Sequence, residues 1–449
     1  MSPGEDSPYL VDASGYRGTA EKVFLPESEA EVVGIIREAA LLKTHVTIGG
    51  AGTGLTGGRV PHGGWLVCLE RLNGIAIHDG FAVCGAGVLL RDLQAAAGPK
   101  QFYAPDPTET GASVGGSIAT NASGSRSFLY GPTRRHVRAM RVVLASGETL
   151  ALRRGEKPPF DLPVLPATDA NKNTAGYYLR PGIDYLDLFI GSEGTLGIVT
   201  EAELTLLPAP RELFTGVVFF ESDEEALKAV DAWRPVPSLR MLEYLDAGSL
   251  DLLRTKTGGI PAGARACVLI EREGEDSDFL DDFMGMEESW FATSAADRER
   301  FRRFRHALPE AVNDLVRRRG LTKMGSDFAV PVARNGEMLR IYRERLEREF
   351  PGQYVIFGHI GDAHLHVNLL PANDEEWKRA SGLLAEFAKE AARLRGTVSA
   401  EHGLGKRKRH LLELQYMPEE IAAMKRVKSL LDPDWLLGPG TLFDGNFQR

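Results

Sequence analysis

Six glycines within ten residues constrain the first part of this chain more than any other feature. Residues 49–58 read GGAGTGLTGG and directly follow the strand-like residues 45–48, HVTI. They contain a formal G-x-G-x-x-G at Gly52, Gly54 and Gly57. In a dinucleotide-binding fingerprint, a helix follows the third glycine, packs on the strand and faces the pyrophosphate. The next residues here, RVPHGG, cannot continue as a helix, so we interpret the match as accidental.

The glycines still suit an anion site of another kind. Together with Thr53 and Thr56, they can point several backbone N–H groups at one anion, as a nest does. A mobile surface loop is the alternative interpretation of this stretch. Two further stretches of small residues, 105–124 and 191–199, favour the anion site.

The composition is that of a globular protein large enough for two or three domains. The chain has 449 residues, of which 43% are hydrophobic and 26% charged, and a net charge of -9. That charge argues against binding to nucleic acid, and we interpret the basic run 406–409 as a solvated face. The cysteines at 68, 84 and 267 lie far apart, so we expect neither a disulfide framework nor an iron–sulfur site.

The N-terminus lacks the features of a signal peptide. Its first residues are acidic and rich in Gly, Ser and Pro, and no apolar run approaches the ~20 residues of a membrane span. We therefore expect a cytoplasmic protein that is at most peripherally attached to a membrane.

Hydrophobic patterning divides the chain at residues 208–210, PAP, which mark a boundary. A capping pattern at 28–31 begins a helix that feeds the strand before the glycine loop. Beyond the boundary, strands and helices alternate, as in an α+β domain with a helix-covered sheet, and the last fifty residues are mainly helical. We predict short strands at 65–69, 82–86, 140–145, 188–190, 203–207, 215–220 and 266–271, and helices at 223–233 and 297–319.

A histidine-rich strand is the clearest candidate for a reactive site. In residues 357–370, FGHIGDAHLHVNLL, His364, His366 and Asn368 share one face of the predicted strand. His359 lies at an odd offset from His366, but the Gly-Asp turn between them can return it to that face. Such imidazoles, with a carboxylate from residues 399–405, SAEHGLG, would suit a divalent ion such as zinc. A polar, solvent-facing strand is the alternative.

Together and in this order, the glycine-rich stretches and the histidine motifs resemble flavoproteins of the vanillyl-alcohol-oxidase type, and within them the D-2-hydroxyacid dehydrogenase branch. That branch includes D-lactate dehydrogenases, D-2-hydroxyglutarate dehydrogenase and the flavin subunit of glycolate oxidase. The resemblance runs from residues 12–16, DASGY, almost to the C-terminus. It implies an α+β fold with a two-part FAD-binding domain at 1–207 and a cap domain built on an antiparallel sheet at 208–400. A C-terminal helical segment at 401–449 would pack back on the FAD domain.

The resemblance also implies which residues bind FAD. Residues 50–57 would bind the pyrophosphate, 105–124 the isoalloxazine and ribityl region, and 193–199 the adenosine half. Some relatives attach the flavin through a histidine in the first loop, and its absence here predicts non-covalent FAD. The candidate contacts are Gly50, Ala51, Gly52, Thr53, Gly54, Leu55, Thr56, Gly57, Pro105, Thr110, Gly111, Ala112, Gly115, Gly116, Ala119, Thr120, Asn121, Gly124, Glu193, Gly194, Gly197, Ile198 and Val199.

Metal, substrate and catalytic roles follow from the same resemblance. The ligands of a divalent ion (zinc, manganese, iron or cobalt) would be His359, His366 and Glu401, and His402 would be the general base. Arg305 and Lys323 stand where the family places cations for the substrate carboxylate, and Asn368 matches another substrate contact. For Arg305 the alternative is a charged helix face, because Arg298, Arg300, Arg302 and Arg303 crowd the same segment.

Three positions depart from the family pattern. Ala363-His364 replace the usual Gly-Asn, and His364 can add a ligand, reshape the substrate pocket or alter the metal preference. Pro309 replaces a threonine that some relatives use on the substrate, which disfavours a diacid like 2-hydroxyglutarate. Residues 438–441, GPGT, stand where relatives usually have Asn-Pro-Gly-Lys, so the resemblance carries over no contact from that lysine.

The predicted reaction is the oxidation of a small D-2-hydroxy acid, such as D-lactate or glycolate, to the 2-oxo acid. His402 would take the hydroxyl proton as hydride leaves the α-carbon for flavin N5. Electrons would then pass to a separate acceptor: a quinone, an electron-transfer protein or an iron–sulfur partner subunit. A homodimer is one assembly that the sequence allows. Two alternatives stay open: a non-catalytic flavin subunit of a glycolate-oxidase-like complex, and a zinc hydrolase that uses the same histidines and Glu401.

Overall fold

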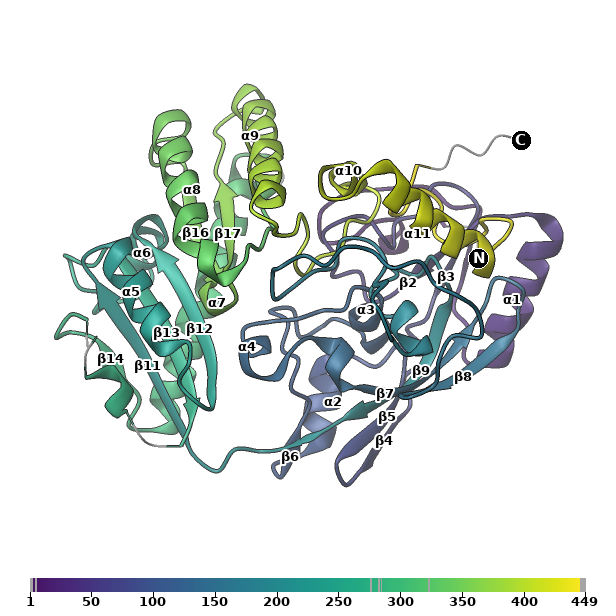
Figure 1. The fold of residues 1–449 in the computed structure, drawn as a ribbon, viewed down its shortest axis with the longest axis horizontal. Coiled ribbons are helices and arrows are strands. Elements are labelled where there is room, and N and C mark those ends of the chain that lie inside the picture. The colour runs from purple at the N-terminus through teal and green to yellow at the C-terminus, as the bar shows by residue number, and fades with distance from the viewer. Residues whose placement is uncertain are drawn as a thin grey trace.

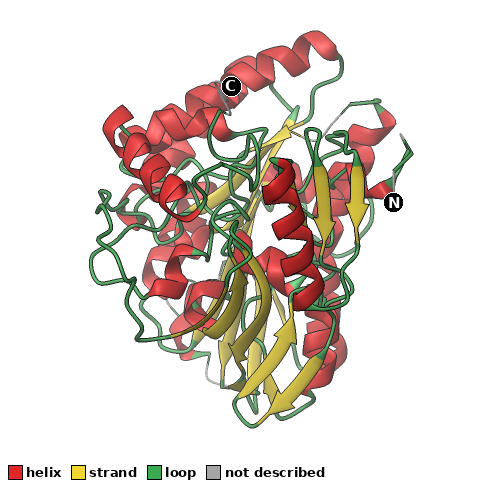
Figure 2. Cartoon of the chain, turned by 90° about the vertical axis from the view of Figure 1, so that its right-hand side faces the viewer, coloured by secondary structure: helices red, strands yellow, loops and turns green. Residues whose placement is uncertain are grey.

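The structure is a computed structural model that describes residues 3–4, 6–274, 277–281, 283, 285–321 and 324–444. Its elements form two groups that lie side by side (Figure 1). The first group contains the N-terminal and C-terminal parts of the chain, and the second contains the middle part. Turned by 90°, the molecule shows strands in its interior and helices around much of its periphery (Figure 2).

The first group contains two main sheets. A parallel sheet in the order β1-β3-β2 consists of β1 (Lys22–Phe24), β2 (Val46–Gly49) and β3 (Trp65–Cys68). It packs on α1 (Glu29–Leu42). At the N-terminus of this helix the backbone N–H of Glu31 donates to Ser28 Oγ, as the capping pattern predicted. An antiparallel sheet in the order β4-β5-β9-β7-β8 consists of β4 (Ile75–His78), β5 (Phe81–Gly85), β7 (Val137–Val143), β8 (Thr149–Arg153) and β9 (Ile198–Thr205). The helices of this region are α2 (Leu90–Ala97), α3 (Val114–Ala119) and α4 (Ser127–Tyr130).

The second group is built on an antiparallel sheet in the order β14-β11-β13-β12-β16-β17-β15. The strands are β11 (Leu213–Phe220), β12 (Leu239–Asp246), β13 (Ala266–Glu273), β14 (Trp290–Phe291), β15 (Met324–Gly325), β16 (Tyr354–His359) and β17 (His364–Leu369). The helices are α5 (Asp223–Trp233), α6 (Ala247–Arg254), α7 (Ala295–Arg318), α8 (Asn335–Glu349) and α9 (Asp374–Arg393).

Helices cover both faces of this second sheet. Along β11 the side chains alternate, so that Val218 and Phe220 join the apolar cluster of α5 and α8, whereas Val217 and Phe219 join that of α6 and α7. Because both faces are buried, the strand sequences are nearly continuous apolar runs. The α+β prediction with an antiparallel cap sheet is confirmed.

The C-terminal part of the chain returns to the first group. Helices α10 (Leu412–Gln415) and α11 (Pro418–Leu431) lie beside the N-terminal strands (Figure 1). Val46 and the segment around Leu437 exchange backbone hydrogen bonds, with Val46 N donating to Leu436 O and Gly438 N donating to Val46 O, both at 2.8 Å. The two ends of the chain are thus joined next to the first glycine loop.

The strand predicted at 188–190 is wrong. Residues Tyr185–Leu188 form a 3-10 turn, and Phe189 continues in helical conformation. Asp184 and Asp187 make the reciprocal bonds of a capping box, which start a helical turn where the apolar letters alone suggested a strand. The small strand β6 (Gln101–Phe102), which was not predicted, pairs with β10 (Leu207–Pro208), whose first residue ends the predicted strand 203–207.

A partly buried ion-pair network joins the two groups. Arg126, at the start of α4, donates through Nε to Glu271 Oε1 on β13 at 2.7 Å and pairs with Asp106 at 3.2 Å. Arg240 on β12 also contacts Glu271, at 2.9 Å. The Glu271 side chain is only 10% exposed, so little water is available to replace these cations.

We predict that Arg126→Gln lowers the free energy of unfolding by about 1–3 kcal/mol, because the buried carboxylate of Glu271 loses one of its two cations and keeps Arg240. Chemical denaturation of the two proteins measures the loss. Arg340→Gln is the matched control, since Arg340 pairs with Glu344 on the surface of α8 with both side chains 60% exposed. The control should lose less than about 0.5 kcal/mol, and equal losses in both variants would contradict the prediction.

The loss of unfolding free energy in Arg126→Gln should also depend on pH. Burial raises the pKa of Glu271, but Arg126 and Arg240 outweigh burial and hold that pKa below its ordinary value. The stabilisation is therefore present above the unfolded-state pKa of about 4.3 and is lost as the pH falls through the lower folded value. The difference between wild type and Arg126→Gln should shrink below about pH 4.

Candidate functional site

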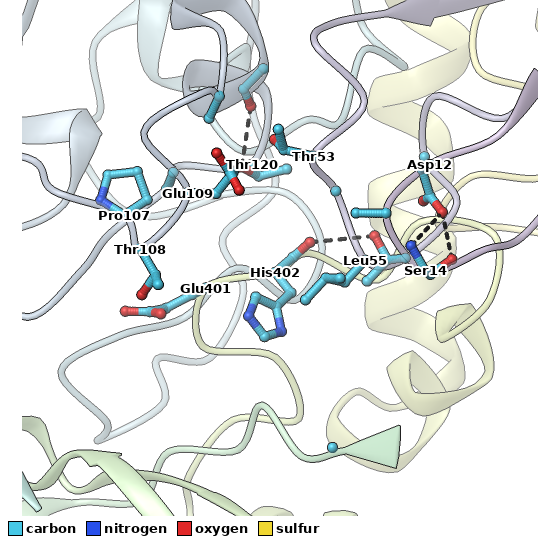
Figure 3. Close-up of a pocket in the computed structure, with 18 of the residues that line it drawn as sticks. Asp12, Ser14, Thr53, Leu55, Pro107, Thr108, Glu109, Thr120, Glu401 and His402 are labelled. Atoms are coloured by element: carbon cyan, nitrogen blue, oxygen red, sulfur yellow. Dashed lines mark hydrogen bonds between the residues drawn. The ribbon is translucent and has the colours of Figure 1, made fainter. Parts of the chain in front are cut away.

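A cavity of about 1180 Å³ has walls from both groups of elements. The three glycine-rich stretches form part of its wall, and β16, β17 and the loop at 401–402 form another part. Figure 3 shows Thr53 and Leu55 of the first stretch near Glu401 and His402. Segments that are more than 300 residues apart in the sequence therefore meet at this cavity.

Most of the predicted FAD contacts line this cavity. Those that line it are Gly50, Ala51, Gly52, Thr53, Gly54, Leu55, Thr56, Ala112, Gly115, Gly116, Ala119, Thr120, Glu193, Gly194, Gly197, Ile198 and Val199. Those that do not are Gly57, Pro105, Thr110, Gly111, Asn121 and Gly124. Two of the latter have other partners, since Gly57 N donates to Asp12 Oδ2 at 2.7 Å and Asn121 Oδ1 accepts from Arg134 N at 2.9 Å.

The first glycine loop fits a ligand that needs close approach to the backbone. The loop connects β2 to β3 and rests against the start of α3, where a Cβ on Gly50 would lie 2.8 Å from Ser113 Oγ. Gly52 has φ 85°, a left-handed conformation that disfavours other residues. Backbone atoms rather than side chains therefore form much of this wall, as a flat, phosphate-bearing cofactor such as FAD requires.

The third stretch is anchored to the C-terminal loop. Glu193, at φ 53°, accepts hydrogen bonds from Leu404 N and Gly405 N, both at 2.8 Å. Burial raises the pKa of Glu193 to about 7, although both backbone N–H groups act in the opposite direction. The Glu193 carboxylate thus holds the segment that follows His402 against the cofactor loops.

The interpretation of residues 406–409 as a solvated face is wrong at its first position. Lys406 is buried, and its Nζ donates to Gly58 O at 3.0 Å and to Thr441 Oγ1 at 3.2 Å. The backbone N–H groups of Lys406 and Arg407 both donate to Thr56 O at 3.0 Å, which draws the run onto the glycine loop. Thr441, the residue that departs from the family pattern, is therefore a partner of this lysine.

The histidine motif forms a hairpin. Strands β16 and β17 pair so that His359 lies opposite His364 and Phe357 lies opposite His366. Ala363 adopts φ 52° at the turn, and the cross-strand pairing returns His359 to the face of His364 and His366. The alternative of a solvent-facing strand does not hold for this face, because His359 and His364 are buried.

The segment 399–405, which carries Glu401 and His402, lies against this hairpin. Glu401 Oε2 lies 3.3 Å from His359 Nε2, and one ligand-capable atom from each of His359, His364, His366 and Glu401 lies within 4.8 Å of the others. Two of the three imidazoles are oriented by a hydrogen bond at Nδ1. His359 Nδ1 bonds the Glu243 carboxylate, and His366 Nδ1 lies 3.0 Å from Ser326 O. Imidazole and carboxylate atoms at such spacing can hold a divalent ion.

The sequence analysis missed three charged residues near this cluster: Lys172, Glu243 and Asp327. Lys172 is buried, and its Nζ lies 2.6 Å from Glu401 Oε1 and 3.2 Å from Asp362 Oδ2. Its loop has no periodic pattern, so the sequence offered no signal. Glu243 did offer one, since it is a lone acid in the apolar run 241–245, MLEYL, of a buried strand.

His402 lies between the hairpin and the first glycine loop. Its carbonyl accepts from Thr56 Oγ1 at 3.4 Å (Figure 3), and its ring stacks on that of His366 with centroids 5.6 Å apart. Its backbone N–H donates to Asp327 Oδ2 at 2.8 Å. Burial lowers the pKa of His402 despite the nearby carboxylate of Asp327, so the imidazole is neutral at neutral pH, as a general base requires.

The predicted substrate residues differ in their surroundings. Arg305 lines the cavity, and its Nε and Nη2 lie 3.0 and 2.9 Å from Glu243 Oε2. Asn368 also lines the cavity; it is buried, and its Nδ2 has no hydrogen-bond partner among the described residues. Lys323 lies outside the described residues.

Comparisons with known proteins cover nearly all of the chain. A family described as FAD linked oxidases, C-terminal domain, matches residues 209–442, and a family described as FAD binding domain matches residues 20–153. The glycolate oxidase subunit GlcD of Bacillus subtilis (strain 168) is 31% identical over 97% of this chain and 92% of that protein. The D-lactate dehydrogenase of Anaerostipes hadrus is 30% identical over the same shares.

The fold is also found in a solved structure. That of alkyldihydroxyacetonephosphate synthase superposes with a TM-score of 0.68 at 17% identity, over 95% of this chain and 77% of that one. At this identity the likeness concerns the fold alone, and it confirms the predicted vanillyl-alcohol-oxidase-type architecture. Within the part of the chain that the structure describes, every helix is too short or too polar to span a membrane.

We predict that Gly115→Val lowers the FAD content of the purified protein. A Cβ on Gly115 would lie 2.8 Å from Ala86 Cβ, so the cavity wall at α3 must shift, at a cost of about 1–3 kcal/mol. FAD affinity should fall at least about tenfold, measured by the flavin-to-protein absorbance ratio and by flavin titration. Gly34→Val in α1 is the control, because no atom lies within 4 Å of its added Cβ, and it should keep its FAD. Full FAD content in Gly115→Val would contradict the prediction.

Proposed function

Because the chain belongs to the family of FAD-linked oxidases, as its motifs predicted, we propose that it oxidises a small D-2-hydroxy acid to the 2-oxo acid. Two relatives, named glycolate oxidase subunit and D-lactate dehydrogenase, support this substrate class by their names. The observation that carries the proposal is the meeting of His359, His366 and Glu401, with His402 beside them, at the cavity that the FAD loops line.

Two groups would complete the site. FAD, when bound, supplies the hydride acceptor, and a divalent metal ion supplies a positive charge that lowers the pKa of the substrate hydroxyl. The glycine-rich stretches would hold FAD without a covalent bond, since the first loop contains no histidine. His359, His366 and Glu401 would hold the metal ion, and their donor set of imidazoles and a carboxylate suits zinc, manganese, iron or cobalt.

The side chains of this protein would orient the substrate and accept its proton. Arg305 would bind the substrate carboxylate, and Glu243 holds its guanidinium group through Nε and Nη2. The unpartnered Nδ2 of Asn368 would donate to a substrate oxygen. His402 would take the hydroxyl proton as hydride leaves the α-carbon, so that two electrons and one proton pass to FAD and one proton to the imidazole.

The domain division and the electron acceptor remain predictions. The predicted division of the chain at residues 207 and 400 would place the cofactor loops in one domain and Arg305, Lys323 and Asn368 in another. Electrons would leave reduced FAD for a separate acceptor, which is a quinone, an electron-transfer protein or an iron–sulfur partner subunit.

An anaerobic bleaching experiment tests the proposal. The yellow holoprotein is mixed with D-lactate, L-lactate or glycolate, and the flavin absorbance near 450 nm is followed with and without a metal chelator. We expect bleaching by D-lactate or glycolate but not by L-lactate, loss of bleaching with chelator, and recovery when metal is restored. Failure of every 2-hydroxy acid to bleach the flavin in the presence of metal would contradict the proposal and favour a non-catalytic flavin subunit.

His402→Asn should keep FAD but bleach about 10²- to 10⁴-fold more slowly, because it removes the group that takes the proton. Stopped-flow absorbance at saturating substrate gives the rate. His78→Asn is the matched control, since His78 lies on β4, stacks on Phe81 and is not part of the cavity wall. A rate in His402→Asn equal to that of His78→Asn would remove His402 from the role of base.

A further inference from the structure

His364 belongs to the cluster of His359, His366 and Glu401, and the proposed reaction assigns it no function. Its side chain is fully buried, and its ring centroid lies 4.3 Å from that of His366 and 5.4 Å from that of His359. It does not line the cavity and therefore does not face the substrate directly. A buried imidazole at this point needs a partner within the protein or a bound ion.

Neither ring nitrogen of His364 has a hydrogen-bond partner among the described residues. Nε2 lies 3.2 Å from Asp327 Oδ1 without hydrogen-bond geometry, and Nδ1 lies 3.8 Å from Glu401 Oε1. Leaving a buried polar group unpaired costs about 1–3 kcal/mol, which a bound cation at Nδ1 would remove. The unpaired nitrogen faces the glutamate that the other two histidines also approach.

The surroundings of His364 repeat those of the two predicted ligands. His359 Nδ1 bonds the Glu243 carboxylate, and His366 Nδ1 bonds the Ser326 carbonyl. In metal sites, a ligating histidine usually donates its second N–H to a carboxylate or carbonyl, which leaves the first nitrogen for the ion. Asp327 is fully buried, and its Oδ1 lies 3.2 Å from His364 Nε2, so a carboxylate stands beside the second ring nitrogen of His364 as well, although at a contact without hydrogen-bond geometry.

We propose that His364 is a fourth protein ligand, so that three imidazoles and one carboxylate hold the ion through His359, His364, His366 and Glu401. This inference rests on the metal site in the proposed function. Three neutral imidazoles and one glutamate leave a divalent ion with one net positive charge. A monoanionic 2-hydroxy acid neutralises that charge, which suits the substrate class.

Four protein ligands also restrict which ion serves the reaction. A 2-hydroxy acid that chelates through its carboxylate and hydroxyl adds two oxygen ligands and brings the total to six. Zinc in proteins is almost always four-coordinate, and its catalytic sites usually have three protein ligands and one open position. An octahedral site of nitrogen and oxygen ligands instead suits Mn²⁺, Fe²⁺ or Co²⁺.

The test measures metal binding rather than turnover. Full-length holoprotein with FAD is stripped of metal, and Mn²⁺ is titrated in while the electron paramagnetic resonance signal of free Mn²⁺ is recorded. Pulsed measurements on the bound ion then count the coordinated imidazole nitrogens. The variants are His364→Asn, which keeps a polar side chain of moderate size, His366→Ala as a loss of a predicted ligand, and His78→Asn as the surface control.

We expect one Mn²⁺ per chain in wild type with three imidazole nitrogens. In His364→Asn we expect two imidazole nitrogens and a Kd at least about tenfold higher, with FAD content and circular dichroism unchanged. An unchanged Kd and three imidazoles in His364→Asn, with binding weakened by His366→Ala, would overturn the inference about His364 alone. Absence of Mn²⁺, Co²⁺ and Zn²⁺ binding to wild type would overturn the metal site itself, and with it both proposals.

Discussion

The buried carboxylate of Asp327 fixes the geometry on which the candidate site depends. It accepts hydrogen bonds from Ser399 Oγ at 2.8 Å and from the backbone N–H groups of Glu401 and His402 at 3.2 and 2.8 Å. It also lies beside His364 of the hairpin. Burial alone raises the pKa of Asp327, but His402 and His364, which are protonated in the acid range where Asp327 titrates, outweigh burial and hold that pKa well below its usual range. A buried charge without partners would be costly, so the loop at 399–402 is confined to the position that satisfies it.

From that anchor the loop reaches the cofactor cavity. Ser123 Oγ of the second small-residue stretch donates to Glu401 Oε1 at 2.6 Å, and Thr56 of the first loop bonds the His402 carbonyl. Glu193 of the third stretch holds the backbone just beyond. Each glycine-rich stretch thus contacts the segment that carries the proposed metal ligand and base. This is how residues from two separate groups of elements can act on one substrate.

Sequence patterns predicted the parts of this arrangement that have local signals. The α5 bounds 223–233 and the cap of α1 at Ser28 were predicted correctly, because capping residues and helical periodicity are local. Strand β17 was predicted from the strict alternation of polar and apolar residues after His364. The prediction of a strand at 188–190 was wrong because the capping box of Asp184 and Asp187 favours a helical turn, although the residues that follow are apolar.

The partners of the site residues could not be predicted in the same way. Lys172 and Asp327 approach Glu401 and His402 from distant segments, and neither belongs to a periodic pattern. Lys406 was predicted to be solvated because a basic run usually is. Instead it is buried against the first glycine loop, where its backbone N–H donates to Thr56 O and its Nζ donates to Gly58 O. Such contacts depend on tertiary packing, which a single sequence does not encode in its local spacing.

A diffraction experiment on crystals of the holoprotein grown with Mn²⁺ tests the central claim most directly, because anomalous scattering locates the ion and the electron density locates the flavin. The account predicts an anomalous peak among His359, His364, His366 and Glu401, with the isoalloxazine ring in the same cavity and His402 between the ion and the first glycine loop. A peak elsewhere, or a flavin ring on a different side of the molecule, would contradict it.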